Sequence, residues 1–170
     1  MTRRSAILTA ALFFLAALGG VAQAGEETMV SAGAAGIFPP GATFAGISIR
    51  GLEFAFGLEL EDGGALGELS VVLLGVGDGG IQTRIAIAGK ATAGSGTAGQ
   101  TATFSGTCSV ALVEGMDPTP DVPFTATVTL DANDQGTLGL VIGETTLPDA
   151  TVNAGSMTIS VPPTATLPAP

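Results

Sequence analysis

The chain of 170 residues carries a formal net charge of −10, with five basic residues, one Cys and no His, Trp or Tyr. So few bases cannot form the positive surface that binds nucleic acid, and we expect no nucleic-acid partner. The lack of His excludes Ser–His and Cys–His nucleophiles and zinc sites built on His. A single Cys excludes an intramolecular disulfide.

Residues 1–24 have the pattern of a secretory signal peptide. Two arginines precede an apolar run over residues 6–18, and small residues occupy positions Ala22 and Ala24, just before Gly25. The run is shorter than the roughly 20 residues that a membrane-spanning helix needs. We therefore predict cleavage before Gly25, no membrane span in the mature chain, and a secreted or periplasmic location.

The composition divides the rest of the chain into three parts. Residues 25–42 are predicted to be a lead-in segment with at most one short strand. Residues 43–161 form the single predicted β domain. Residues 162–170 contain four prolines, which cannot donate to a sheet, and are predicted to be a disordered, extended tail.

Alternation of apolar and polar residues with period two dominates the β domain, and no segment has helical periodicity. In the clearest case, Phe104, Cys108 and Val110 share one face of a strand whose other face is Thr and Ser. The phase of the alternation shifts at Gly51, which predicts a bulge. Predicted strands cover residues 47–60, 69–76, 81–88, 101–112, 124–131, 138–142 and 157–161. Of these, 69–76 is apolar on both faces and is predicted to be a central strand or one covered on both faces.

Short acidic or Gly-rich segments at residues 61–65, 77–80 and 132–136 predict hairpins, and hence antiparallel pairing. The longer links, over residues 89–99, 113–122 and 144–154, suit crossings between two sheets. We therefore predict an all-β fold, a single antiparallel β-sandwich of about seven or eight strands. The alternative is a curled meander or a small β-barrel.

Two acidic segments resemble cation sites but lack a full set of ligands. The segment from Asp131 to Gly136 has Asp, Asn and Gly at calcium-loop offsets, yet strands flank it and the twelfth position is Ile142 rather than Glu. We predict an ordinary hairpin turn there. The loop with Glu114, Asp117 and Asp121 is predicted to be a proline-stiffened surface loop, so no metal site is predicted.

The remaining candidate sites also have simpler structural interpretations. Cys108 is predicted to be a buried apolar residue, and residues 93–99 a flexible Gly-rich loop without the helix that a phosphate site needs. A Ser nucleophile with Lys90 as its base is formally possible, but no sequence motif supports it. The Thr and Ser rows at 101–109 and 125–129 could bind a repeating lattice, but Thr also favours exposed strand positions.

The sequence therefore predicts no catalytic residues, no cofactor and no enzymatic activity. We expect an exported, bacterial, non-enzymatic β domain that acts as a structural, surface or adhesive module of the cell envelope or extracellular space. Its partner would be an extracellular or cell-surface component that the sequence does not identify. The alternative function is a small β-barrel that binds an apolar ligand, which would require an unfilled apolar cavity of some hundreds of Å³.

Overall fold

The computed structural model describes residues 27–112, 117–133 and 135–162, and ten strands in them form a single antiparallel sheet. Residues 1–24, the predicted signal peptide, and residues 163–170 of the predicted tail lie outside the described residues. A 3₁₀ turn, η1 (Asp78–Gly80), joins the fourth strand to the fifth. The strands are β1 (Thr28–Ile37), β2 (Thr43–Phe44), β3 (Ile47–Glu61), β4 (Gly64–Val76), β5 (Gln82–Thr97), β6 (Thr101–Ala111), β7 (Thr119–Leu130), β8 (Gly136–Ile142), β9 (Thr145–Thr146) and β10 (Ala150–Ser160).

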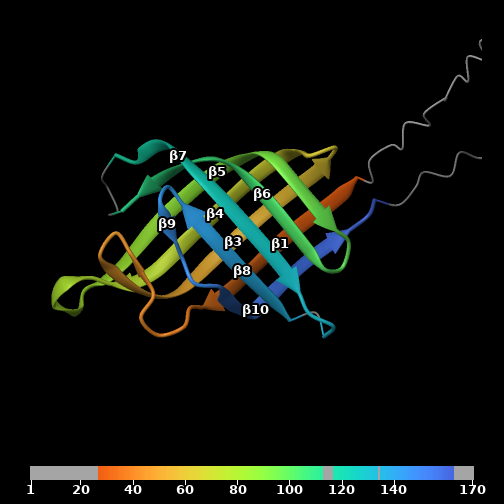
Figure 1. Cartoon of the computed structure of the whole chain (residues 1–170). Helices are drawn as coiled ribbons and strands as arrows, with labels where there is room; N and C mark the ends of the chain where they lie inside the picture. The colour runs from red at the N-terminus through yellow and green to blue at the C-terminus, as the bar shows by residue number, and fades with distance from the viewer. Residues whose placement is uncertain (1–26, 113–116, 134, 163–170) are drawn as a thin grey trace, which may run out of the picture.

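The sheet closes on itself because β1 pairs with both β3 and β10. From β3 onward each long strand pairs with the next one in the chain, up to β10. The result is an up-and-down barrel of eight strands, with the short strands β2 and β9 attached to β3 and β8 (Figure 1). Both ends of the described chain lie at the same end of the barrel.

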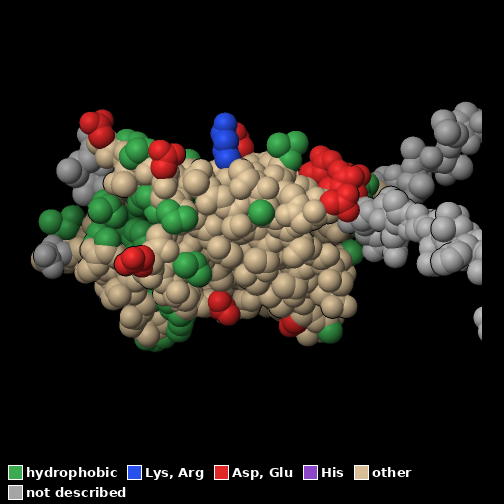
Figure 2. Space-filling model, turned by 45° about the horizontal axis from the view of Figure 1, so that its top comes forward, with side chains coloured by type: hydrophobic (Ala, Val, Ile, Leu, Met, Phe, Trp, Pro, Cys, Tyr) green, Lys and Arg blue, Asp and Glu red, His purple; other side chains and the backbone are tan. Residues whose placement is uncertain are grey.

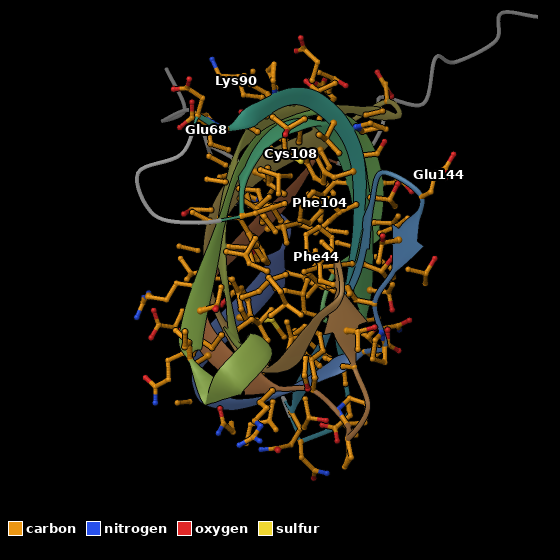
Figure 3. All side chains as sticks on the ribbon, turned by 90° about the vertical axis from the view of Figure 1, so that its left-hand side faces the viewer. Phe44, Glu68, Lys90, Phe104, Cys108 and Glu144 are labelled. Atoms are coloured by element: carbon orange, nitrogen blue, oxygen red, sulfur yellow. The ribbon has the colours of Figure 1, made fainter. Side chains whose placement is uncertain are left out.

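The core lies inside the barrel. Along β3 the residues Leu52, Phe54, Phe56 and Leu58 are buried, whereas the intervening residues face outward. A view along the barrel shows the ring of strands filled by side chains, with Phe44, Phe104 and Cys108 inside and Glu68, Lys90 and Glu144 outside (Figure 3). The period-two pattern of the sequence thus separates an apolar interior from a polar outer wall.

Both ends of the barrel are covered. At one end the connection between β1 and β3 buries Phe38 and Phe44. At the end with the termini, the β5–β6 hairpin bends over the interior, where a Cβ on Gly94 would meet the side chain of Leu60. A Cβ on Gly106 would overlap the carbonyl oxygen of Lys90, so this close approach of β5 and β6 requires glycine.

The seam between β8 and β10 is the least regular part of the wall. β10 pairs with β8 only through Ala150 and Thr151, and β9 pairs with β8 only at Val141 and Ile142. Beyond this point the tip of the β5–β6 hairpin bridges the gap. The Gly99 amide donates to the Ile159 carbonyl at 2.8 Å, and the Leu130 amide donates to the Gln100 carbonyl at 2.7 Å.

The predicted all-β antiparallel class is confirmed, but the preferred two-sheet sandwich is wrong because all the strands share one sheet. The alternative, a curled meander or small barrel, describes the observed topology. Segments assigned to crossings are largely strand: β5 continues to Thr97, and β10 begins at Ala150. The prediction of a flexible Gly-rich loop over residues 93–99 is therefore wrong for residues 93–97. These residues belong to β5 and pair with β6.

One further prediction for a single segment needs correction, one is right in part, and two are confirmed. Residues 28–37, within the predicted lead-in, form a full strand that closes the barrel. Residues 69–76 belong to a central strand, as one alternative predicts, because β4 pairs with both β3 and β5. They are not covered on both faces, since Val72 and Leu74 are half-buried on the outer wall. The bulge at Gly51 is present as a register shift. The β3–β4 hairpin turns through Asp62 and Gly63, both with positive φ, as a type I′ turn requires.

Candidate functional surface

The interior is filled by an aromatic cluster rather than by an empty cavity. The Phe104 ring lies 5.3 Å from that of Phe56 and 6.3 Å from that of Phe124, in edge-to-face arrangements. Phe54 stacks on Phe56 at 5.7 Å. The best-formed hollows, of about 670 and 570 Å³, are open troughs lined mainly by outward-facing residues. These two hollows therefore lie on the outside of the barrel and not within its core.

Cys108 lies inside the barrel, as its face assignment predicts, with a relative exposure of 4 %. Burial raises the pKa of the Cys108 thiol, because the thiolate would lose its hydration. A thiol kept protonated inside the core is a weak nucleophile. The position suits a small apolar residue and does not suit catalysis.

The Asp131 carboxylate acts as a turn residue. One of its oxygens, Oδ1, accepts hydrogen bonds from the amides of Asn133 and Gln135, both at 2.8 Å. These two backbone hydrogen bonds lower the pKa of Asp131, because they favour its charged form. This is the geometry of an Asx turn in a hairpin. Asp134 lies outside the described residues.

The other acidic segment also gathers no ligand set in the described chain. Asp117 and Asp121 are exposed, and Glu114 lies outside the described residues. Among residues 27–112, 117–133 and 135–162, no group of three or more Cys, Asp or Glu side chains is placed to hold a metal ion.

Threonines form a row across five strands of the outer wall. In the pairing register, Thr97 lies opposite Thr101, then Thr129, Thr137 and Thr151 follow on successive strands. In the next row the hydroxyl groups of Thr103 and Thr127 are 3.2 Å apart. The sequence places hydroxyl groups on β6 and β7, but the length of the row appears only once the register of all five strands is known.

A second surface feature is the trough on β3, β4 and β5 at the end of the barrel opposite the termini, which we call the basic trough. Its lining includes Arg50, Leu74, Ile81 and Arg84, and its volume is about 670 Å³. It gathers two of the three basic residues in the described chain, which lie 34 positions apart in the sequence. The Arg84 guanidinium pairs with the Glu53 carboxylate at 2.9 Å, whereas Arg50 forms no ion pair within the described residues.

The turn between β3 and β4, at the end where the termini lie, carries the opposite charge. This acidic hairpin, residues 59–66, contains Glu59, Glu61 and Asp62 together with Leu66, whose side chain is 72 % exposed. Figure 2 shows acidic side chains gathered beside the grey terminal segments and apolar side chains gathered toward the other end. The sequence alone predicts no role for the basic trough or for the acidic hairpin. Arg50 and Arg84 are far apart in the sequence, and only the folded barrel brings them to one trough.

Comparison with known proteins does not identify a function for these surfaces. No helix in the described part of the chain is long and apolar enough to cross a membrane. Searches against protein-family models, curated protein sequences and solved structures found no match for this chain.

Proposed function

We propose that the chain is an exported, non-enzymatic β domain that acts as a structural, surface or adhesive module outside the cytoplasm. The observation that carries this proposal is the division of the barrel into a filled interior and a hydroxyl-rich outer wall. The rings of Phe54, Phe56, Phe104 and Phe124 occupy the space that a carried ligand would need. Contact through the wall and the loops is the role that remains for such a domain.

The main competing function, binding of an apolar ligand inside the barrel, is disfavoured by the same observation. A ligand-binding cavity commonly measures a few hundred Å³ and encloses most of the ligand. The hollows of comparable size in the described part of the chain are open: the two larger ones lie on the outer wall, and one of about 420 Å³ lies beside Phe38 at the end of the barrel. Ligand entry would also require movement of the β5–β6 hairpin or of the segment with Phe38 and Phe44.

The location outside the cytoplasm is supported by the signal-like segment, whose pattern favours export and cleavage. A bacterial host that expresses the full chain with a C-terminal tag should yield, in its periplasm or medium, a protein that begins at Gly25. Recovery of the uncleaved chain from the cytoplasm would contradict the localisation.

Titration with a fluorescent fatty acid tests the structural role against the carrier role. We expect no saturable binding at micromolar probe, because no apolar volume is open to it. The matched control is Phe104→Ala, which should create a cavity and gain some binding if it folds. Saturable binding of one probe to each wild-type chain would overturn the structural assignment.

A further inference from the structure

We propose that the acidic hairpin of one copy of this chain docks into the basic trough of the next copy, so that the barrels associate head to tail. The inference deepens the proposed structural role, on which it rests, by naming a second copy of the chain as a partner. It follows from the placement of charge and of exposed apolar side chains on the barrel.

The two surfaces lie at opposite ends of the same strand. Arg50 is near the start of β3 and Glu61 is its last residue. With a rise of about 3.3 Å per residue, the two side chains are about 36 Å apart along the strand. No copy can therefore satisfy its own trough with its own hairpin, but a neighbour aligned along the barrel axis can.

Charge complementarity favours a second copy as the occupant. The basic trough holds Arg50, which has no ion-pair partner in the described chain, and Arg84, whose partner Glu53 is itself 53 % exposed. The acidic hairpin presents Glu59, Glu61 and Asp62. Attraction between such groups is local. The mature chain keeps three basic and fifteen acidic residues, and the repulsion between its net charges of −12 is screened beyond about 8 Å at physiological ionic strength.

Exposed apolar side chains favour the same pairing. The hairpin is a tight type I′ turn whose Gly63 carbonyl accepts a hydrogen bond from the Gly94 amide of β5, and the trough is an open hollow of about 670 Å³. Leu66 beside the acidic hairpin is 72 % exposed, and Ile81 in the trough is 69 % exposed. These are the two most exposed of the large apolar side chains on the described part of the barrel, and one lies at each docking surface.

The symmetry of the contact follows from its two different surfaces. A contact that uses unlike patches is heterologous, and it extends into an open row unless the rotation between copies closes a ring. Because the patches lie at opposite ends of the long axis, we expect an open row of barrels. A structural module would gain length in this way without any further partner.

Sedimentation velocity of the purified mature chain at about 0.15 M salt tests the proposal. The weight-average mass of the wild type should rise with concentration. The trough variant Arg50→Gln with Arg84→Gln and the hairpin variant Glu61→Gln with Asp62→Asn should each associate at least about tenfold more weakly. Asn is chosen at position 62 because it tolerates the positive φ there.

A mixture of the two variants gives the sharpest readout. Each variant retains one intact surface, so an equimolar mixture should form heterodimers and stop there. The control Glu144→Gln with Asp149→Asn makes the same charge change as the hairpin variant on exposed residues of the β8–β10 connection, and should associate like the wild type. Circular dichroism checks that every variant is folded.

Three results would overturn the proposal. They are a wild-type mass that stays monomeric at all concentrations, equal weakening by the Glu144 control, and a mixture that forms no heterodimer. None of these results bears on export or on the fatty-acid titration, so the structural role would be judged separately.

Discussion

The wall formed by β3, β4 and β5 and the seam between β8 and β10 are parts of one sheet, yet they are held together differently. In the wall, β4 is paired on both sides along almost its whole length. At the seam, β8 and β10 pair only at Ala150 and Thr151, and the hairpin tip at Gly99 bridges the rest. The wall consists of local hairpins, whereas the seam depends on contacts between distant segments.

The difference indicates where the barrel should yield first. Backbone ladders with continuous buried side chains open only with the whole domain, whereas short pairings open locally. We expect the seam to be the less stable part of the ring. Four predictions test that contrast, and they run from the largest expected effect to the smallest.

Truncation of a core side chain in the continuous part of the ring should have the largest effect. Phe104 on β6 is 1 % exposed and contacts two other rings, so Phe104→Ala should reduce the free energy of unfolding by about 3–5 kcal/mol. Met157 at the seam is only partly buried, so Met157→Ala should cost about 1 kcal/mol or less. Urea denaturation measures both, and equal losses would contradict the contrast.

Two matched glycine substitutions, one in the continuous part of the ring and one at the seam, should differ in the same direction, with smaller losses of unfolding free energy. A Cβ at Gly106 would meet the rigid backbone at Lys90, so Gly106→Ala should cost about 2–3 kcal/mol. A Cβ at Gly136 would meet only the flexible end of Met157, so Gly136→Ala should cost less than about 1 kcal/mol. A larger loss at Gly136 than at Gly106 would show that the seam is rigidly packed.

The reactivity of Cys108 reports on opening of the barrel. Its buried thiol, with a raised pKa, should react slowly with a thiol reagent in native buffer and rapidly in denaturant. Labelling that is faster in Gly136→Ala than in wild type would place the opening at the seam. Rapid labelling of the native wild type, or a disulfide-linked dimer, would contradict the inward orientation of Cys108.

The Asp131 turn beside the seam should give the smallest effect. Because the folded pKa of Asp131 is lowered, its stabilising effect is present above its unfolded pKa and is lost as pH falls through the folded value. Asp131→Asn should therefore leave the melting temperature near neutral pH almost unchanged. As the pH is lowered, the melting temperature of the variant should decrease less than that of the wild type. Calcium and magnesium at equal ionic strength should act alike on both proteins, and a calcium-specific rise in wild type alone would contradict the turn assignment.

The sequence predicted the local features of this fold and missed the closure. Alternation along residues 101–112 and the turns at residues 61–65 and 77–80 are properties of neighbouring residues, and all three are present. Closure joins β1 to β10, more than 100 residues later in the chain. Inside β1, Val30 is followed by Ala32 and Ala34, whose small side chains give little hydrophobic contrast with the outer face.

The candidate surfaces were less predictable than the core for the same reason. The inward position of Cys108 and the turn at Asp131 follow from local patterns. The threonine row and the meeting of Arg50 with Arg84 depend on strand register, which a bulge shifts by one residue. Gly51 and the irregularity near Ala91 are such shifts, and no pattern in the sequence measures their combined effect.

Native-state hydrogen exchange, resolved by residue, tests the central claim that β1 closes a filled barrel. We predict that amides of Val30 to Gly36 are protected nearly as well as those of β4, because β1 has a partner on both sides. Amides of β10 beyond Thr151 should alternate, with those directed toward β1 protected and those directed toward the seam exchanging quickly. Exchange of the β1 amides at the rate of an exposed loop would mean an open sheet, and would contradict both the closed barrel and the surface role derived from it.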